Sequence, residues 1–278
     1  MGLNPGWRGP RANENAQPRT VRRLVLVEVK QLIRICFALI LILASCAVRA
    51  YEKVDVPTVH GVPTRVLIAP TQAAKATVLL FIGGTGLVKI ADDGRTNHIH
   101  TFVRSLGMWR AYELQPVLID SPFDLGNARR GHQRASKEHL DRVSEVVRHF
   151  HLNSSQPIWI FGHSMGTSTV AAFLSSDRPE VSLLKGYIVA GTHKGESVPA
   201  SIKLPVLGIH HKREACPFTP ISASEAIIKS RTPDTPRAMV LLDGGNDQGD
   251  VCQALAYHGF NGIEQDLIKT AAEFVLKH

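Results

Sequence analysis

A serine flanked by two glycines is the feature of this chain with the most definite chemistry. The residues Gly162-His163-Ser164-Met165-Gly166 match the pattern G-x-S-x-G, in which a sharp turn between a strand and a helix presents a nucleophilic serine. Glycine suits positions 162 and 166 because a Cβ there would crowd the neighbouring strands and the start of the helix. A serine hydroxyl is a poor nucleophile at neutral pH, so the turn also requires a nearby base and a carboxylate that orients the base.

Two loops later in the chain offer the base and the carboxylate. His258 follows the last predicted strand and precedes the last predicted helix, and Gly259 frees that loop from side-chain crowding. Glu214 follows a strand predicted over 205–210, which gives the chain order serine, acid, histidine. We therefore predict that His258 is the base and that Glu214 orients it. The other carboxylates that stay open for the acid role are Asp243, Asp247 and Asp250.

A second glycine-rich stretch predicts where an oxyanion would be stabilised. Residues 83–86, Gly-Gly-Thr-Gly, directly follow an apolar strand predicted over 76–82. We expect one backbone N–H donor from Met165, next to the nucleophile, and the other from this stretch, at Thr85. An ordinary tight turn remains the alternative for the glycines. The stretch does not match a dinucleotide-binding motif, because it lacks the later glycine and an acidic residue about 20 positions on.

Several other polar residues near these motifs are predicted to be structural. His163, beside the nucleophile, is expected to pack locally, outside the catalytic set. His210 and His211 are adjacent in a strand and so point to opposite faces, which favours support of the acid loop over a metal site. Asp120 ends an earlier strand and is expected to anchor its own loop. Three arginines that could attract an anionic substrate are instead expected on a solvated loop: Arg129, Arg130 and Arg134.

Short apolar runs alternate with helix-spaced apolar residues from residue 51 onward. Such alternation indicates βαβ units and a mainly parallel sheet, here of about eight strands flanked by helices, in a single α/β domain over 51–278. The strands are predicted over 52–56, 64–68, 76–82, 115–120, 158–161, 186–190, 205–210 and 237–242. The helices are predicted over 98–112, 135–150, 222–230 and 263–276, with one more that begins at 167.

The short connection between two predicted strands leaves no room for a cap domain. Residues 191–204 are too few to fold as a further unit. We therefore expect an open site, with a rim formed by the loops near 86–97, 121–134 and 192–203.

Residues 1–50 are typical of an export signal with a polar segment before it. The apolar run over 35–48 has about 14 residues, fewer than the roughly 17–25 that usually span a bilayer. We expect cleavage after Ala50; the alternatives are lipidation at Cys46, within a sequence that resembles a bacterial lipobox, and an uncleaved anchor. The segment before residue 25 has a composition typical of disorder, which we interpret as a start site placed too early. The basic residues before the apolar run include Arg22, Arg23, Lys30 and Arg34.

Export makes the cysteines informative, since disulfides persist in oxidising compartments. Removal of the leader leaves Cys216 and Cys252, an even pair. We predict a disulfide between them, with two separate buried thiols as the alternative. The bond would tie the loop of Glu214 to the loop of His258, and closing so long a loop stabilises a fold by roughly 3–4 kcal/mol in the chain-entropy description.

The excess positive charge of the chain is concentrated in the leader. The 278 residues include 32 Lys and Arg and 24 Asp and Glu, for a formal net charge of +8. Residues 1–50 hold 8 Lys and Arg against 2 Asp and Glu, which leaves 24 against 22 for residues 51–278. We therefore expect no polyanion-binding surface and no nucleic-acid partner.

From about Ala76 to the C-terminus the chain resembles the α/β-hydrolase superfamily, on the order of residues 83–86, 162–166, Glu214 and His258. Within it, His-His-Lys-Arg-Glu-Ala-Cys over 210–216 and the segment 252–264 are similar to a group of small, cap-less, exported bacterial hydrolases. Relatives of that group typically carry Asp where Glu214 stands, and His-Gly in place of the glycine run. The resemblance implies the α/β-hydrolase fold, ester-type chemistry and no cofactor, and it indicates no particular substrate.

Together these patterns predict a periplasmic or secreted serine hydrolase that acts on carboxylic esters through an acyl-enzyme. Two alternatives remain: acyl transfer to an alcohol or amine on the same residues, and a non-catalytic binding protein on the same fold. The expected partner is a small-molecule acyl substrate. Contact with a membrane is expected only through a lipid at Cys46 or an uncleaved leader.

Overall fold

The computed structural model describes residues 1–2, 51–127 and 133–278. Its contacts divide the chain into Met1–Val48 and Arg49–His278, and the elements described below all belong to the second unit. The predicted signal sequence, its cleavage after Ala50 and the lipidation of Cys46 lie outside the described residues, as do two of the three loop arginines.

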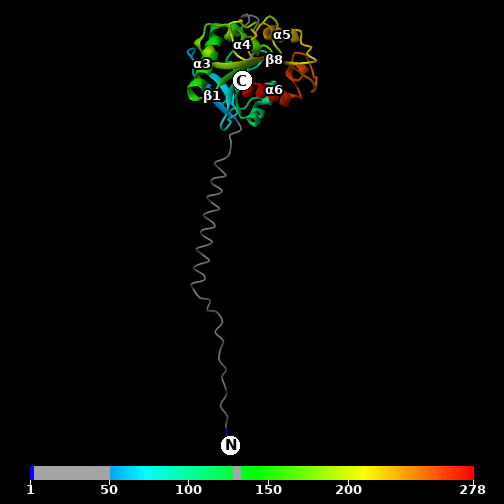
Figure 1. Cartoon of the computed structure of the whole chain (residues 1–278). Helices are drawn as coiled ribbons and strands as arrows, with labels where there is room; N and C mark the ends of the chain where they lie inside the picture. The colour runs from blue at the N-terminus through cyan, green and yellow to red at the C-terminus, as the bar shows by residue number, and fades with distance from the viewer. Residues whose placement is uncertain (3–50, 128–132) are drawn as a thin grey trace. The chain divides into compact units, whose positions relative to one another are not determined.

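One sheet of eight strands forms the centre of the fold (Figure 1), which confirms the predicted α/β architecture. Its spatial order is β1-β2-β4-β3-β5-β6-β7-β8. The pairs β1–β2 and β2–β4 are antiparallel, and every other pair is parallel. The strands are β1 (Glu52–Val56), β2 (Thr64–Ile68), β3 (Ala76–Phe81), β4 (Leu114–Ile119), β5 (Ile158–His163), β6 (Leu184–Ala190), β7 (Val206–His211) and β8 (Arg237–Leu242).

The burial of each strand follows its place in the sheet. All six residues of β3 and all six of β5 are buried, because helices cover both faces of these central strands. No residue of β8, the strand at one edge, is buried to the same degree. β3 and β5 are parallel neighbours, with Phe81 opposite Gly162. The strand that leads to residues 83–86 therefore ends beside the strand that leads to Ser164.

Helices pack on both faces of the sheet, each set over its own apolar cluster (Figure 1). One face is covered by α3 (Lys137–Asn153), α4 (Gly166–Leu174) and α5 (Ile221–Lys229). The other is covered by α6 (Glu264–Lys277) together with α2 (Thr101–Arg104) and the 3-10 helix η1 (Leu106–Tyr112). The remaining short 3-10 helices of the described residues are η3 (Gln133–Ala135), η4 (Pro179–Leu183) and η5 (Tyr257–Gly259).

The helix predicted over 98–112 is interrupted in the structure. It is a single α-helical turn, α2, that continues as η1 after Ser105. Ser105 has φ −101° and ψ 3°, and its hydroxyl donates to the carbonyl oxygen of Thr101. A hydroxyl that bonds back to the preceding turn competes with regular helix, and Gly107 soon after has a low helix propensity. Tertiary packing of this segment against α6 then decides its path.

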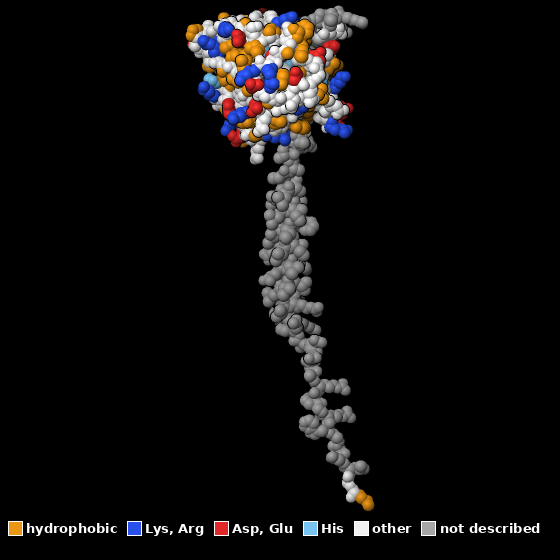
Figure 2. All heavy atoms as spheres, turned by 90° about the vertical axis from the view of Figure 1, so that its right-hand side faces the viewer, with side chains coloured by type: hydrophobic (Ala, Val, Ile, Leu, Met, Phe, Trp, Pro, Cys, Tyr) orange, Lys and Arg blue, Asp and Glu red, His pale blue; other side chains and the backbone are white. Residues whose placement is uncertain are grey.

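The connection between β6 and β7 agrees with the predicted lack of a cap domain. Residues 191–205, all of them described, contain no helix or strand. None of the helices in the described ranges combines the length and apolar composition needed to cross a bilayer. On the face shown in Figure 2, Lys and Arg are interspersed with Asp and Glu.

Candidate active site

Ser164 stands on a sharp turn between β5 and α4. Its φ of +54° lies in the left-handed region, which residues other than glycine rarely adopt. A Cβ at Gly162 would lie 2.4 Å from the carbonyl oxygen of Gly166, and a Cβ at Gly166 would lie 2.0 Å from that of Phe81. Close backbone approach therefore requires both glycines, as the sequence pattern predicts. The N–H of Ser164 donates to the carbonyl oxygen of Ala190 at 2.9 Å and holds the turn against β6.

His258 lies in η5, with its imidazole buried against the carboxylate of Glu214. Nδ1 of His258 is 2.9 Å from Oε2 of Glu214 and 3.2 Å from Oγ1 of Thr219. Because an ionised carboxylate only accepts hydrogen bonds, these partners assign the proton of the neutral ring to Nδ1. Nε2 is then the nitrogen that can take up a proton. The ring has room because residue 191 is glycine: a Cβ on Gly191 would lie 3.1 Å from Cε1 of His258.

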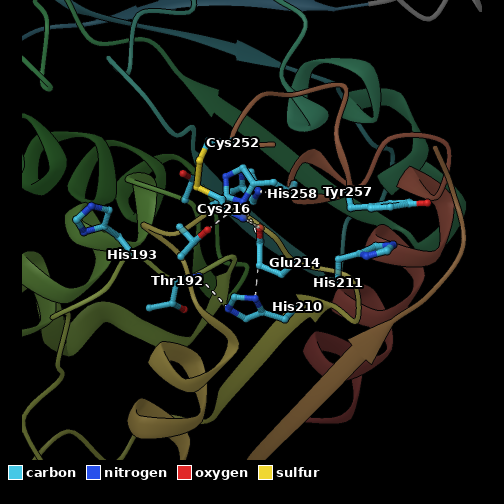
Figure 3. Close-up of polar contacts among 12 residues, drawn as sticks. Thr192, His193, His210, His211, Glu214, Cys216, Cys252, Tyr257 and His258 are labelled. Carbon is cyan, nitrogen blue, oxygen red and sulfur yellow. Dashed lines mark hydrogen bonds and ion pairs between the residues drawn. A yellow bond between two sulfur atoms is a disulfide. The ribbon is translucent and has the colours of Figure 1, made fainter. Parts of the chain in front are cut away.

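Glu214 has 2% of its side chain exposed and lies between His258 and His210 (Figure 3). Its Oε1 accepts the N–H of Cys216 at 2.9 Å, and its Oε2 lies 3.9 Å from Nδ1 of His210. The N–H of Thr192 donates to Nε2 of His210, which assigns the proton of that ring to Nδ1, on the side of Glu214. Burial lowers the pKa of His210 to about 4, so the ring is neutral near pH 7. His210 therefore packs beside the carboxylate of Glu214 as a neutral ring, at a distance too long for a hydrogen bond.

The other three carboxylates that the sequence left open for the acid role are exposed and bonded elsewhere. They are Asp243, Asp247 and Asp250. The first forms ion pairs with Lys212 and Arg213. The second and third each accept a hydrogen bond from a backbone N–H in the segment 252–257. Of the four candidates, Glu214 is the one that the structure brings to the ring of His258.

A disulfide joins the acid loop to the base loop, as predicted. Cys216 and Cys252 are bonded across a sequence separation of 36. Because Cys216 also donates its N–H to Glu214, the covalent bond holds the backbone segment that positions the carboxylate. Both cysteines line the cavity that Ser164 also lines.

Residues 83–86 form a tight turn beside the nucleophile. A Cβ on the first glycine would lie 3.2 Å from Oγ of Ser164, and the second glycine has a φ of +55°. Thr85 is exposed in this turn and lines the cavity, as does Met165 at the N-terminus of α4. N–H groups at a helix N-terminus have no intrahelical partner, so that of Met165 is placed to bind an anion. The structure thus brings Thr85 and Met165, the two residues expected to supply oxyanion donors, to the wall of the same cavity.

Arg134 is buried, which corrects the expectation of a solvated loop. It is 1% exposed, and its guanidinium donates to the carbonyl oxygens of Ile82 at 3.0 Å and Gly84 at 2.8 Å. A third bond, of 3.1 Å, goes to Oγ1 of Thr169 on α4. Burial lowers the pKa of Arg134 to about 9, so the group stays charged near pH 7. The sequence did not indicate this role, because an arginine in a polar loop is most often exposed.

Asp120 anchors a loop, although not the one that follows it. Its carboxylate accepts the N–H groups of Val88 at 2.6 Å and Ile90 at 2.9 Å, in the segment after residues 83–86. Burial raises the pKa of Asp120 and the two backbone bonds oppose that shift. Asp120 and Arg134 therefore hold the two ends of the loop that carries Thr85.

A cavity of about 660 Å³ opens where β3 and β5 end, and both Ser164 and His258 line it. The loop 192–203 contributes His193, as predicted. Most of the remaining rim comes from 98–100, 216–218 and 252–254, where the loops 86–97 and 121–134 were expected. Described residues of those two loops, among them Gly86, Ser121 and Leu125, line a separate small cavity instead.

The remaining histidines singled out in the sequence have distinct environments. His211 points away from Glu214, on the opposite side of the strand from His210, as expected for adjacent residues of a strand (Figure 3). Its ring stacks on Tyr257, with ring centroids 4.5 Å apart. His163 does more than pack locally, because it bonds both His100 and the backbone of His258. Within the described residues, no group of three or more His, Cys, Asp or Glu side chains is arranged to hold a metal ion.

No family model and no curated protein matches the sequence. Solved structures of several proteins share its fold. A dienelactone hydrolase from Anabaena variabilis has a TM-score of 0.56 at 15% identity, over 83% of this chain and 99% of its own. A serine hydrolase without a lid from Xanthomonas campestris has a TM-score of 0.53 at 12% identity, over 82% and 94%. Esterase 2 from Thermogutta terrifontis, solved phosphoramylated by tabun, has a TM-score of 0.57 at 12% identity, over 84% and 96%.

Proposed function

We propose that this protein, a chain of the α/β-hydrolase fold without a lid, is a serine hydrolase that acts on carboxylic esters. One observation carries the proposal: Ser164 on its strained turn and His258 line the same cavity, while Glu214 holds the imidazole from behind. The proteins of similar fold named above are a dienelactone hydrolase, a serine hydrolase and an esterase, which supports hydrolysis at the level of reaction type.

In the proposed reaction, Oγ of Ser164 attacks the ester carbonyl carbon while Nε2 of His258 takes the hydroxyl proton. The N–H groups of Met165 and Thr85 stabilise the negative charge that develops on the carbonyl oxygen. His258 then gives its proton to the leaving alcohol, and an acyl-enzyme remains. Water repeats the sequence on the acyl-enzyme and releases the acid. Glu214 stabilises the imidazolium through the Nδ1–H bond in each half of the cycle.

The cavity favours substrates that are uncharged near the reacting bond. Among the described residues that line it there is no Lys, Arg, Asp or Glu. Ile99 and Phe218 line it and are each 53% exposed, so the rim presents apolar surface to water. A neutral acyl or alcohol group would cover that surface, whereas a charged group would lose hydration without gaining a partner. We therefore propose neutral esters as the substrate class.

We also propose that the protein is exported. The disulfide is typical of an oxidising compartment, and the sequence of residues 1–50 resembles a secretion signal. Mass spectrometry of protein recovered from the producing cell tests this: an N-terminus at Tyr51 supports cleavage after Ala50. A lipid-modified N-terminus at Cys46 would support the anchor alternative, and an intact leader on cytoplasmic protein would contradict export.

Labelling with a fluorophosphonate probe tests the proposed function. We expect the wild-type protein to be labelled and the Ser164→Ala variant to resist labelling. A panel of neutral p-nitrophenyl esters of different acyl length should then be hydrolysed with loss of activity in the same variant. Product analysis with an added alcohol separates hydrolysis from acyl transfer. Folded wild-type protein that neither labels nor turns over would indicate a binding protein on this fold.

The assignment of the acid is tested by paired carboxamide substitutions. Glu214→Gln should lower kcat by about 10²–10⁴-fold, because the amide cannot stabilise the imidazolium. Asp250→Asn removes a carboxylate of the neighbouring loop that bonds the N–H of Cys252, and it should leave kcat within about threefold. Steady-state hydrolysis of one p-nitrophenyl ester measures both. A loss confined to Asp250→Asn would show that Glu214 is the wrong carboxylate.

A further inference from the structure

Two buried histidines form a hydrogen-bonded chain that ends on the backbone of the base loop. Nε2 of His100 lies 2.9 Å from Nδ1 of His163, and Nε2 of His163 lies 2.9 Å from the carbonyl oxygen of His258. The two residues are 6% and 2% exposed. His100 is the N-cap of α2, and His163 is the last residue of β5, directly before Ser164. The chain therefore links the backbone of the proposed base to the residue that precedes the proposed nucleophile.

The partners assign each ring as neutral with its proton on Nε2. The N–H of Phe102 donates to Nδ1 of His100 at 3.1 Å, so that nitrogen is an acceptor. The carbonyl oxygen of His258 only accepts, so Nε2 of His163 must donate to it. The remaining bond then runs from Nε2–H of His100 to Nδ1 of His163. In this arrangement Nε2 of His100 carries a proton and cannot accept the N–H of Gly83. That contact, at 3.3 Å, is longer than the other three.

The reverse direction is excluded by shorter contacts. It would place a lone pair of His163 against the carbonyl oxygen of His258 at 2.9 Å, and an N–H of His100 against the N–H of Phe102. Burial lowers the pKa of both His100 and His163 well below the ordinary value, and the neighbouring imidazoles lower it further. Both rings are therefore neutral, and each donates through Nε2–H: His100 to Nδ1 of His163, and His163 to the carbonyl oxygen of His258.

We propose that His100 and His163 are a positioning pair that fixes the main chain of His258 relative to Ser164. The proposal rests on the proposed roles of Ser164 and His258. Glu214 orients the imidazole of His258 through its side chain, and His163 holds the same residue through its carbonyl group. Two separate anchors determine where Nε2 points. A displacement of about 1 Å between reacting groups can lower a rate by about 100-fold, so loss of one anchor affects the chemical step.

Substitutions at residue 163 test the pair through kinetics. His163→Leu removes both hydrogen bonds, and we expect kcat for a p-nitrophenyl ester to fall by about 10- to 100-fold with KM changed by less than about twofold. His163→Gln keeps one acceptor and one donor and should recover most of that loss. His151→Asn, at the exposed end of α3, is the matched control and should behave as wild type. A folded His163→Leu protein with kcat within about twofold of wild type would overturn the proposal.

Substitution of His100 separates its two roles. The side chain of asparagine still caps α2 by accepting the N–H of Phe102, but it is too short to reach His163. We expect His100→Asn to lower kcat as His163→Leu does, and the double variant to lose no more than either, because both act through one bond to His258. Multiplied losses in the double variant would contradict a single chain.

The protonation of the ring nitrogens can be measured directly in the wild-type protein, without an activity assay and without any variant. In ¹⁵N NMR of the wild-type protein near pH 7, both rings should be neutral with Nε2 protonated. A ring protonated on Nδ1, or a cationic ring, would overturn the assignment. Absence of fluorophosphonate labelling at Ser164 would overturn the proposed function and the positioning role with it. Labelling of Ser164 together with unchanged kcat in His163→Leu would overturn the positioning role alone.

Discussion

Arg134 and His210 hold the two sides of the site in different ways. Arg134 bonds the backbone of residues 82–84, so its charge serves to fix the loop that carries one proposed oxyanion donor. His210 is a neutral ring that accepts the N–H of Thr192 and turns its Nδ1 toward the carboxylate of Glu214, 3.9 Å away. Both side chains are buried, so neither can exchange its partners for water when the site is altered.

The buried guanidinium of Arg134 can be tested by removing its charge and its hydrogen bonds. Arg134→Met leaves the carbonyl oxygens of Ile82 and Gly84 unpaired, and we expect the free energy of unfolding to fall by about 1–3 kcal/mol. The loosened loop should also lower kcat by about 10- to 100-fold with little change in KM, because a displaced oxyanion donor acts in the transition state. Urea unfolding and ester hydrolysis measure the two effects.

The control for this prediction is Arg95→Met, which removes an exposed arginine that pairs with Asp93. It should change neither quantity appreciably, since exposed ion pairs contribute about 0–1 kcal/mol. Equal kinetics in the two variants would show that Arg134 has no part in holding residues 83–86.

The residues of the candidate site lie where the parallel strands of the sheet end. β3, β5, β6 and β7 are parallel, so the segments that follow them emerge on one edge of the sheet. These segments carry residues 83–86, Ser164, Gly191 and Glu214, in the order of the strands. The base comes from η5, after the edge strand β8, and must therefore reach across that edge. The disulfide and the hydrogen bond from His163 both hold the segment that carries His258.

Removal of the disulfide tests how the two loops depend on each other. The double variant Cys216→Ser/Cys252→Ser should lose about 3–4 kcal/mol in the free energy of unfolding, as expected for a closed loop of this length. We also expect kcat/KM to fall by about 10-fold, because Cys216 no longer holds the backbone donor to Glu214 in place. Urea unfolding with and without reductant measures stability, and ester hydrolysis measures activity.

Reductant serves as the internal control for that experiment. It should bring the wild-type protein to the stability of the double variant and leave the double variant unchanged. Equal stability of oxidised wild type and double variant would show that the bond contributes nothing to the fold.

For the whole molecule, buried neutral histidines set the response to acid. His100, His163 and His210 all have pKa values lowered by burial, in the last case to about 4. Each binds a proton more readily in the unfolded chain than in the folded one. Their contribution to stability is therefore complete above the unfolded value of about 6.5 and is lost as the pH falls from there toward the folded value. The fold should weaken below pH 6.5.

We expect the free energy of unfolding to fall steeply between pH 6.5 and 4. A shift from 6.5 to about 4 in His210 alone corresponds to about 3 kcal/mol. His210→Asn keeps an acceptor for the N–H of Thr192 and should flatten this part of the profile. Asp55 and Asp141, with pKa values of about 2, lose their contribution only below pH 4 and do not interfere. Urea unfolding at intervals of pH measures the slope, and an unchanged slope in His210→Asn would contradict the account.

Local patterns in the sequence predict the fold, the sharp turn at Ser164 and the disulfide, all of which the structure contains. Apolar runs buried on both faces predict central parallel strands, and β1, β2 and β8 match their predicted ranges. The glycines at 162 and 166 predict the turn of Ser164, because backbone approach at that turn is a local requirement. The order of Ser164, Glu214 and His258 follows from where strands end. The disulfide follows from the two cysteines that flank those loops.

Tertiary structure alone decided which polar groups lie together across the sheet edge. Glu214 is distinguished from the other candidate acids, Asp243, Asp247 and Asp250, by its hydrogen bond to His258. The distance between those two side chains depends on how the loop after β7 packs against η5. The burial of Arg134 and the pairing of His100 with His163 join segments far apart in sequence, and no periodicity records such contacts. Sequence patterns report the neighbours along the chain, whereas burial and hydrogen-bond direction depend on neighbours in space.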